Sequence, residues 1–169
     1  RGNLAFQTEA ATLRGGMAGF NADQILEVTG INRSNILRSR DTNVGLMNLE
    51  KDEVNRRAIK DEINMVGDIR MAFASSGVSA STGSARALKV TEMNEAEFSR
   101  LYEQNIQQQQ ILGYFATETE RANLTQREGQ LAAEASIANA EFESSILIAE
   151  ANQNVSNQEA NARDSGVRT

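Results

Sequence analysis

Apolar side chains recur every three or four residues over most of this chain, which is the spacing of helices with one apolar face. Residues 3–28 predict a first amphipathic helix, although three glycines within it lower its helix propensity. Gly30 is the expected end of this helix, because glycine commonly follows a helix C-terminus. We therefore expect residues 1–30 to form a separate N-terminal helix.

A longer apolar stripe predicts a helix over 31–76, the first arm of a hairpin. Its members lie at three- and four-residue spacing over 44–73: Val44, Met47, Val54, Ala58, Ile59, Ile63, Val66, Ile69 and Phe73. The opposite face is densely charged, and it contains favourable pairs four residues apart, such as Glu53 with Arg57. This face is expected to be solvated.

The segment 77–84 is rich in glycine and serine and predicts the bend of the hairpin. Gly77 is placed to end the first arm in the left-handed backbone conformation, and Gly83 lies at the far end of the bend. The second arm is expected to be capped by a hydroxyl of Ser81, Thr82 or Ser84. A nucleotide-binding P-loop is disfavoured, because the glycine spacing is one residue too long and Ser84 stands where lysine is required.

The second arm is predicted over 85–162, with a polar, flexible tail over 163–169. Its first part has the alternating steps of a heptad seam: Phe98, Leu101, Asn105, Gln108, Leu112, Phe115, Thr119 and Ala122. The stripe resumes in a shifted frame, with Gly129 at the change: Leu131, Ala135, Ala138, Phe142, Ile146 and Ala149.

The first arm is too short to cover the second. The distal half of the second arm therefore needs apolar cover from the N-terminal segment, from a neighbouring copy or from another protein. We predict that Leu131, Phe142 and Ile146 lie in a homo-oligomer interface. The expected fold is all-α: a long helical hairpin with coiled-coil-like packing and an N-terminal helix, assembled in an oligomeric ring or tube.

The composition narrows the chemistry that this chain of 169 residues can perform. It contains no Cys and no His, which excludes disulfides, thiolate metal sites and histidine-dependent catalysis. The carboxylate pairs have no visible apolar pocket to separate their pKa values. We therefore expect a protein that is not an enzyme and that binds no cofactor or metal.

The net charge is −6, but the charge is unevenly distributed. Residues up to Val90 hold 12 basic and 10 acidic side chains, whereas the remainder holds 5 and 13. The best candidates for DNA contact are the basic cluster Arg33, Arg38, Arg40, Arg56, Arg57 and Lys60. We favour the alternative that these side chains form salt bridges with acidic neighbours, and that the acidic second arm borders any passage for DNA.

No run of about 18 apolar residues occurs, so no transmembrane helix is expected in this sequence. The chain begins with Arg1 instead of Met, so we expect a processed or partial product, and a preceding apolar segment would lie outside it. Within the sequence, the candidate membrane contacts are the apolar residues of the first helix, namely Phe6, Leu13, Met17 and Phe20.

The residue order is distinctive over 65–84, which reads M-V-G-D-I-R-M-A-F-A-S-S-G-V-S-A-S-T-G-S. Residues 105–107 and 113–116 and an Ala-rich continuation follow it. From about residue 55 to 140, the chain resembles the internal virion proteins of tailed bacteriophages. It is most similar to the smallest internal core, or ejection, proteins of short-tailed phages.

This resemblance implies a helical, oligomeric, non-enzymatic protein without cofactors. Such a protein is stored in the virion interior at the portal vertex, with the portal and other internal virion proteins as partners. On ejection it leaves before the genome and forms part of a channel through the host outer membrane and periplasm, through which genomic DNA passes transiently. Two other classes stay open: a coiled-coil scaffold or adaptor of a virion or secretion assembly, and a DNA-binding clamp that uses the basic cluster.

Overall fold

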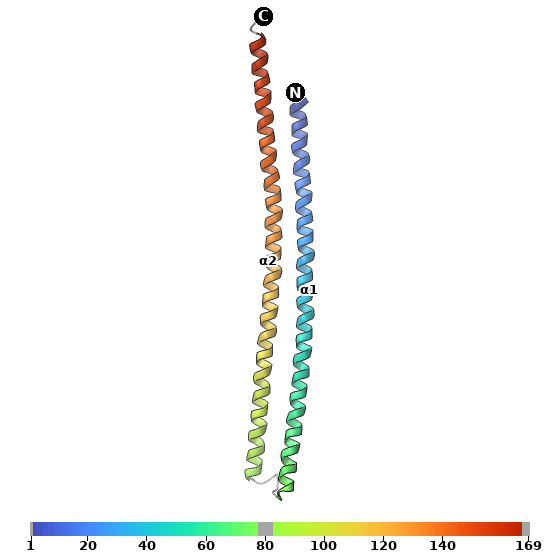
Figure 1. Cartoon of the computed structure of the whole chain (residues 1–169), viewed down its shortest axis with the longest axis vertical. Helices are drawn as coiled ribbons and strands as arrows, with labels where there is room; N and C mark the ends of the chain where they lie inside the picture. Colours follow the sequence, from blue (N-terminus) through green and yellow to red (C-terminus); the bar gives the residue numbers. More distant parts are fainter. Residues whose placement is uncertain (1, 78–82, 167–169) are drawn as a thin grey trace. The chain divides into compact units, whose positions relative to one another are not determined.

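In the computed structural model, the chain forms two helices that pack against each other as an antiparallel hairpin (Figure 1). They are α1 (Gly2–Ser75) and α2 (Gly83–Gly166). The structure describes the backbone of residues 2–77 and 83–166, and the side chains from residue 5 onward. Within these described residues there is no strand. The all-α hairpin predicted from the sequence is confirmed.

The predicted helix end at Gly30 is wrong. α1 runs through this residue without interruption, and so joins the two predicted helices into one. Glycine in a helix costs only about 1 kcal/mol relative to alanine. A helix that packs along a partner tolerates this cost, because most helix stability in proteins comes from packing.

The connection between the helices agrees with the predicted bend at its first residue. Gly77 has a φ of 73°, the left-handed conformation expected of it. Its N–H donates to the Ala74 carbonyl at 3.3 Å, which closes the last turn of α1. Gly83 and Ser84 lie in the first turn of α2, so they are part of the helix and not of the bend. Residues 78–82, including the proposed caps Ser81 and Thr82, lie outside the described residues.

The predicted flexible tail is wrong for 163–166, which continue α2 as helix. The remaining tail residues, 167–169, lie outside the described residues. No proline or glycine interrupts the segment before Gly166, so local sequence offers no reason for the helix to end at 162.

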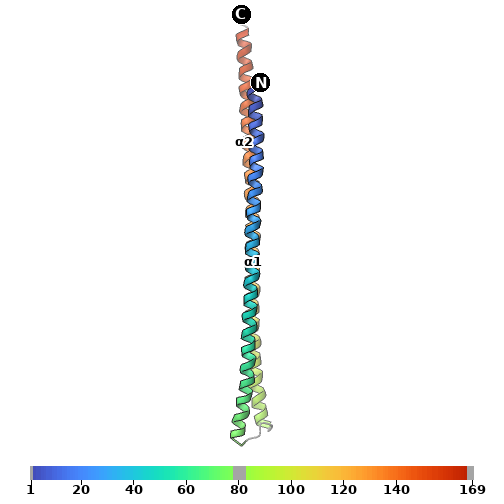
Figure 2. The ribbon, with the colours of Figure 1, turned by 90° about the vertical axis from the view of Figure 1, so that its right-hand side faces the viewer.

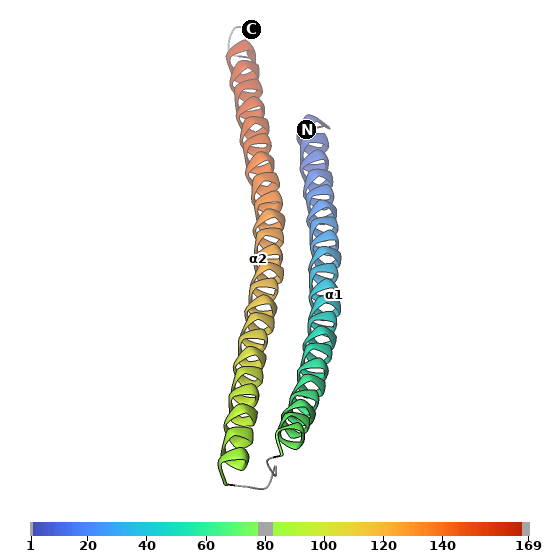
Figure 3. The same cartoon turned by 60° about the horizontal axis from the view of Figure 1, so that its bottom comes forward.

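The hairpin divides into two compact units. Unit 1 comprises Arg1–Asn35 with Arg121–Thr169, and unit 2 comprises Ile36–Glu120. In unit 1, the blue part of α1 lies beside the orange and red part of α2 (Figures 1 and 2). The N-terminal segment therefore covers the distal half of the second arm, one of the three options that the sequence left open. Figure 3 shows that α2 extends past the start of α1 in this unit.

Small side chains form the contact between the helices in unit 1. The buried and half-buried positions of α2 recur at steps of three, four and four residues: Ala122, Thr125, Gly129, Ala133, Ser136, Ala140, Ser144, Leu147 and Ala151. The matching positions of α1 are Gln7, Ala11, Ala18, Ala22, Ile25 and Thr29. We call these lines the inner stripes. An 11-residue repeat over three turns is close to the period of a straight helix, so each stripe keeps facing the partner.

Gly129 marks the closest approach of the helices in unit 1. It is buried, and a Cβ placed on it would overlap the side chain of Thr29. At the other described glycines, a Cβ would meet no atom within 4 Å, apart from the helix's own backbone and the adjacent residues. Gly129 is therefore required by the packing of α2 on α1.

The inner stripes of unit 2 carry larger side chains. On α1, seven residues of the predicted stripe are half-buried as expected: Val44, Met47, Val54, Ala58, Val66, Ile69 and Phe73. Ile59 and Ile63 are exceptions, with 39% and 66% of their surface exposed. On α2, the inner stripe begins at Ala85 and contains Ala96, Arg100, Gln104, Gln107, Ile111 and Tyr114.

The heptad seam predicted for α2 is wrong as a continuous contact line. Phe98, its first member, is 72% exposed, whereas its last member, Ala122, is completely buried. A seam with a period of 3.5 residues drifts by about 20° per heptad around a straight helix. The predicted seam therefore does not follow one face of α2: Phe98 and Leu112 are exposed, whereas Gln108 contacts α1 and Ala122 lies in the inner stripe.

We predict that Gly129→Ala destabilises the hairpin by about 1–3 kcal/mol, because the added methyl group must displace Thr29 or separate the helices. Urea unfolding followed by circular dichroism at 222 nm measures the loss. Gly113→Ala is the matched control, since its Cβ meets open space. It should be neutral or stabilising by up to about 1 kcal/mol. Equal effects of the two substitutions would contradict the close approach at Gly129.

Candidate functional site

The largest apolar side chains of unit 1 point away from the contact between the helices. On each helix, positions two residues along from the inner stripe lie about 200° round the axis and form an outer stripe. The outer stripe of α2 contains Leu124, Arg127, Leu131, Ala135, Ala138, Phe142 and Ile146, and that of α1 contains Leu13, Met17, Phe20, Gln24, Glu27, Ile31 and Asn35. Phe6, one heptad before Leu13, extends the α1 stripe. All of these residues are exposed.

In an ordinary core the large apolar side chains are buried, whereas here small side chains are buried and large apolar ones are exposed. Among the described residues, the buried apolar side chains are seven alanines and Ile111. By contrast, Phe6, Met17 and Phe142 are 70%, 68% and 67% exposed. The surface area is 12494 Å², whereas a compact chain of this mass exposes about 8,200 Å². The hairpin alone leaves a large apolar area in water.

Two residue sets singled out in the sequence lie on these outer stripes. The predicted oligomer contacts Leu131, Phe142 and Ile146 belong to the α2 stripe, with exposures of 65%, 67% and 42%. The candidate membrane contacts Phe6, Leu13, Met17 and Phe20 belong to the α1 side of the same unit. The sequence analysis missed Leu124 and Ile31, which become apparent once the 11-residue period is known.

The predicted basic cluster does not form one surface. In unit 1, Arg33 is half-buried, and its Nε has no hydrogen-bond partner. In unit 2, Arg40 packs its guanidinium 4.0 Å from the centre of the Phe115 ring and pairs with Asp41 at 2.6 Å. Arg38 and Lys60 are exposed on the outer side of α1.

The last two members of the cluster, Arg56 and Arg57, share one carboxylate. Both pair with Glu53 at 2.9 Å, which confirms the predicted pair four residues apart. Hydrogen bonds from Arg56 and then Arg57 lower the pKa of the Glu53 carboxyl from 4.5 to about 2. The same bond raises the pKa of Arg56. Half of the basic cluster, counting Arg40, is therefore engaged with acidic side chains of α1 itself.

A line of polar contacts between the helices fixes their register in unit 2. Arg40 donates to Thr119 Oγ1 at 2.8 Å, and Asn43 donates to the Tyr114 hydroxyl at 2.7 Å. Further along, Lys51 donates to Gln108 Oε1 at 2.7 Å, and Arg100 donates to Glu62 at 2.9 Å. Of the two amides in the predicted seam, Gln108 thus contacts a lysine of α1, whereas Asn105 is exposed. Sequence spacing alone could not pair these residues, because the pairing depends on the register of the helices.

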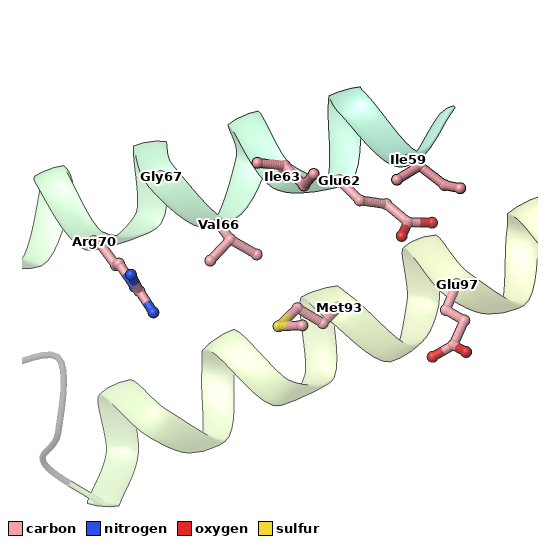
Figure 4. A pocket seen from close by; sticks show the side chains of 8 residues that line it. All are labelled: Ile59, Glu62, Ile63, Val66, Gly67, Arg70, Met93 and Glu97. Carbon is pink, nitrogen blue, oxygen red and sulfur yellow. The ribbon is translucent and has the colours of Figure 1, made fainter. Parts of the chain in front are cut away.

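An open groove lies between the helices of unit 2 near the bend. Its volume is about 460 Å³, and it is lined by Ile59, Glu62, Ile63, Val66, Gly67, Arg70, Met93 and Glu97. Figure 4 shows Val66 and Arg70 projecting from α1 toward α2. Glu62 is engaged with Arg100, which leaves the groove mainly apolar.

Two searches of the described residues bear on the remaining candidate chemistry. Neither helix contains a stretch that is long and apolar enough to cross a membrane, as far as the chain is described. Within the same residues, no three side chains from Asp and Glu gather to form a candidate metal site.

Comparison with known proteins identifies no matching family, no matching curated protein and no matching solved structure. The outer stripes are therefore the candidate site that the molecule itself provides.

The Arg100–Glu62 pair should contribute measurably to unit 2, because its side chains are only 19% and 24% exposed. Arg100→Gln leaves the Glu62 carboxylate half-buried without its charge partner, and we expect a loss of about 1–3 kcal/mol. A double-mutant cycle with Glu62→Gln, measured by urea unfolding, should give a favourable coupling energy. Arg86→Gln, at an exposed site on the same helix, is the control and should cost less than about 0.5 kcal/mol. Additive effects of the paired substitutions would contradict the interaction.

The lowered pKa of Glu53 predicts how this local cluster responds to pH. A carboxyl whose pKa is lowered by folding stabilises the helix above pH 4.5, and this contribution is lost as the pH falls toward 2. Carboxyl ¹³C NMR, with Glu53→Gln to assign the signal, should give a midpoint near 2. Replacing both Arg56 and Arg57 by Gln should return the midpoint toward 4.5. A midpoint near 4.5 in the parent protein would reject the shared pairing.

Proposed function

We propose that this chain is a non-enzymatic structural subunit that assembles with further copies of itself through the outer stripes. We further propose that the assembly forms part of the conduit through which a tailed bacteriophage delivers its genome across the host outer membrane. Before ejection, the protein would be stored inside the virion with the portal and other internal virion proteins.

The exposure of the large apolar side chains is the observation that carries the assembly. Leu131 and Phe142 on α2, and Met17 on α1, are each about two-thirds exposed, while alanines occupy the contact between the helices. Burial of apolar area contributes about 25 cal/mol per Å², so an isolated hairpin forgoes much of the stabilisation that its own residues could provide. A second copy that covers these apolar side chains would provide this stabilisation.

The conduit is supported by the sequence resemblance and by the charge of α2. Over 83–166, α2 carries 6 basic and 13 acidic side chains. A wall of this sign repels DNA weakly and lets it pass without binding. The clamp alternative is less favoured, because Arg40, Arg56 and Arg57 are paired with carboxylates of α1.

Phe142→Asp tests the assembly, because it places a charge in the centre of the α2 outer stripe. Sedimentation velocity should show the parent as an oligomer and Phe142→Asp as a folded monomer of unchanged helicity. Gln130→Asp adds the same charge at an exposed position outside both stripes of α2, and it should leave the oligomer intact. A parent that is monomeric and helical at high concentration would reject the assembly.

The same preparations test the conduit. We expect the parent oligomer to release dye from vesicles made of outer-membrane lipid, and Phe142→Asp to release none. An oligomer that leaves the vesicles intact would favour a scaffold. Micromolar DNA binding at physiological salt that is lost on replacing Arg38 and Lys60 by Gln, with the oligomer unharmed, would favour the clamp.

A further inference from the structure

We infer that the contact between copies is heterologous: the outer stripe of α1 in one copy packs on the outer stripe of α2 in the next. This inference rests on the proposed assembly and specifies which surfaces meet in it. Contacts of this kind join unlike surfaces, so they propagate from copy to copy into rings or filaments instead of stopping at a dimer.

The apolar side chains of unit 1 are arranged for such a contact. Each outer stripe lies opposite its own inner stripe, so the two outer stripes are on opposite sides of the helix pair. They also lie at the same level. Ser144 contacts the Ala11 carbonyl at 3.4 Å, and Ala18 and Ala140 line one shallow hollow between the helices. Leu13 and Met17 are therefore level with Phe142 and Ala138.

A glycine on the outer side of α1 leaves room for a close neighbour in unit 1. Gly16 is exposed beside Met17, and a Cβ on it would meet nothing within 4 Å. The hairpin itself does not require this glycine, in contrast to Gly129, although it lowers helix stability by about 1 kcal/mol relative to alanine. A large side chain of a neighbouring α2, such as Phe142, fits against the space that Gly16 leaves.

Two copies could meet through two α1 outer stripes, through two α2 outer stripes, or through one of each. The charges of unit 2 favour one of these pairings. In unit 2, the outer stripe of α1 carries Arg38, Arg56 and Lys60 together with Glu53 and Asp68. Arg56 is already paired with Glu53. The outer stripe of α2 over 91–120 holds Glu120 and no basic residue. Contact between two α2 stripes would bring carboxylates together. Contact between α1 and α2 instead brings Arg38 and Lys60, which pair with no carboxylate among the described residues, toward the acidic α2 stripe.

Arg38 and Glu120 are the best-defined pair for this contact. The hydrogen bond from Arg40 to Thr119 places them at one level of unit 2, on opposite sides of the helix pair. Both are exposed, and neither has a hydrogen bond or ion pair within the residues that the structure describes. In a row of level hairpins, Arg38 of each copy faces Glu120 of the next.

Charge reversal tests the pairing. Arg38→Glu and Glu120→Arg should each raise the concentration for half-maximal assembly about five- to tenfold, measured by sedimentation velocity at low salt. An equimolar mixture of the two variants should assemble at the parent's concentration, because alternating copies restore an opposite pair at every contact. Arg86→Glu makes the same charge change away from the outer stripes, and it should assemble as the parent does.

Three results would overturn the inference. Stronger assembly of either single variant would indicate contact between like stripes. Unchanged assembly of both single variants would show that the pair is not at the interface. The same conclusion would follow if the mixture assembled no better than either variant alone. In these cases the parent still assembles, so the proposed function survives. A parent that stays monomeric, or that only binds lipid vesicles through its outer stripes, would reject both.

Discussion

The small side chains between α1 and α2 are the constraint on which the rest of the structure depends. Alanine, glycine and serine let the helix backbones approach closely, most of all where Gly129 meets Thr29 in unit 1. In unit 1, this close contact leaves little room for large side chains between the helices. Leucine, methionine and phenylalanine are consequently placed on the outside, and the hairpin can gain a core of ordinary size only by meeting another molecule.

The register of α1 against α2 is fixed by different interactions in the two units. Unit 2 uses specific hydrogen bonds, including Arg40 to Thr119 and Arg100 to Glu62, whose partners are correct in one register only. Unit 1 has few such bonds among its described residues and depends on the fit of small side chains. Several basic residues are engaged within the hairpin, and of the basic cluster in unit 2 only Arg38 and Lys60 pair with no carboxylate among the described residues.

The sequence predicted the helices and the bend better than it predicted their faces. Periodicity and the absence of proline identified two helical arms, and Gly77 was correctly placed in the left-handed conformation. The heptad assumption failed for α2, because the large apolar residue Phe98 suggested a buried seam, whereas the contact line beside it contains Ala96, Arg100 and Gln104. Side-chain size is usually a guide to burial, and it misleads where helices pack through small residues. Leu131, Phe142 and Ile146, which the sequence assigns to an oligomer interface, are exposed in the single chain.

A cysteine scan of α2 tests the central claim most directly, and the absence of native cysteine makes it straightforward. Single cysteines over 122–147 would be labelled in the dilute monomer with a small maleimide. The structure predicts slow labelling at steps of three, four and four residues, at positions such as Gly129, Ala133 and Ala140, and fast labelling at Leu131, Ala135 and Phe142. Slow labelling of the second group in the monomer, with a period of 3.5 residues, would contradict the inner stripe and the account built on it.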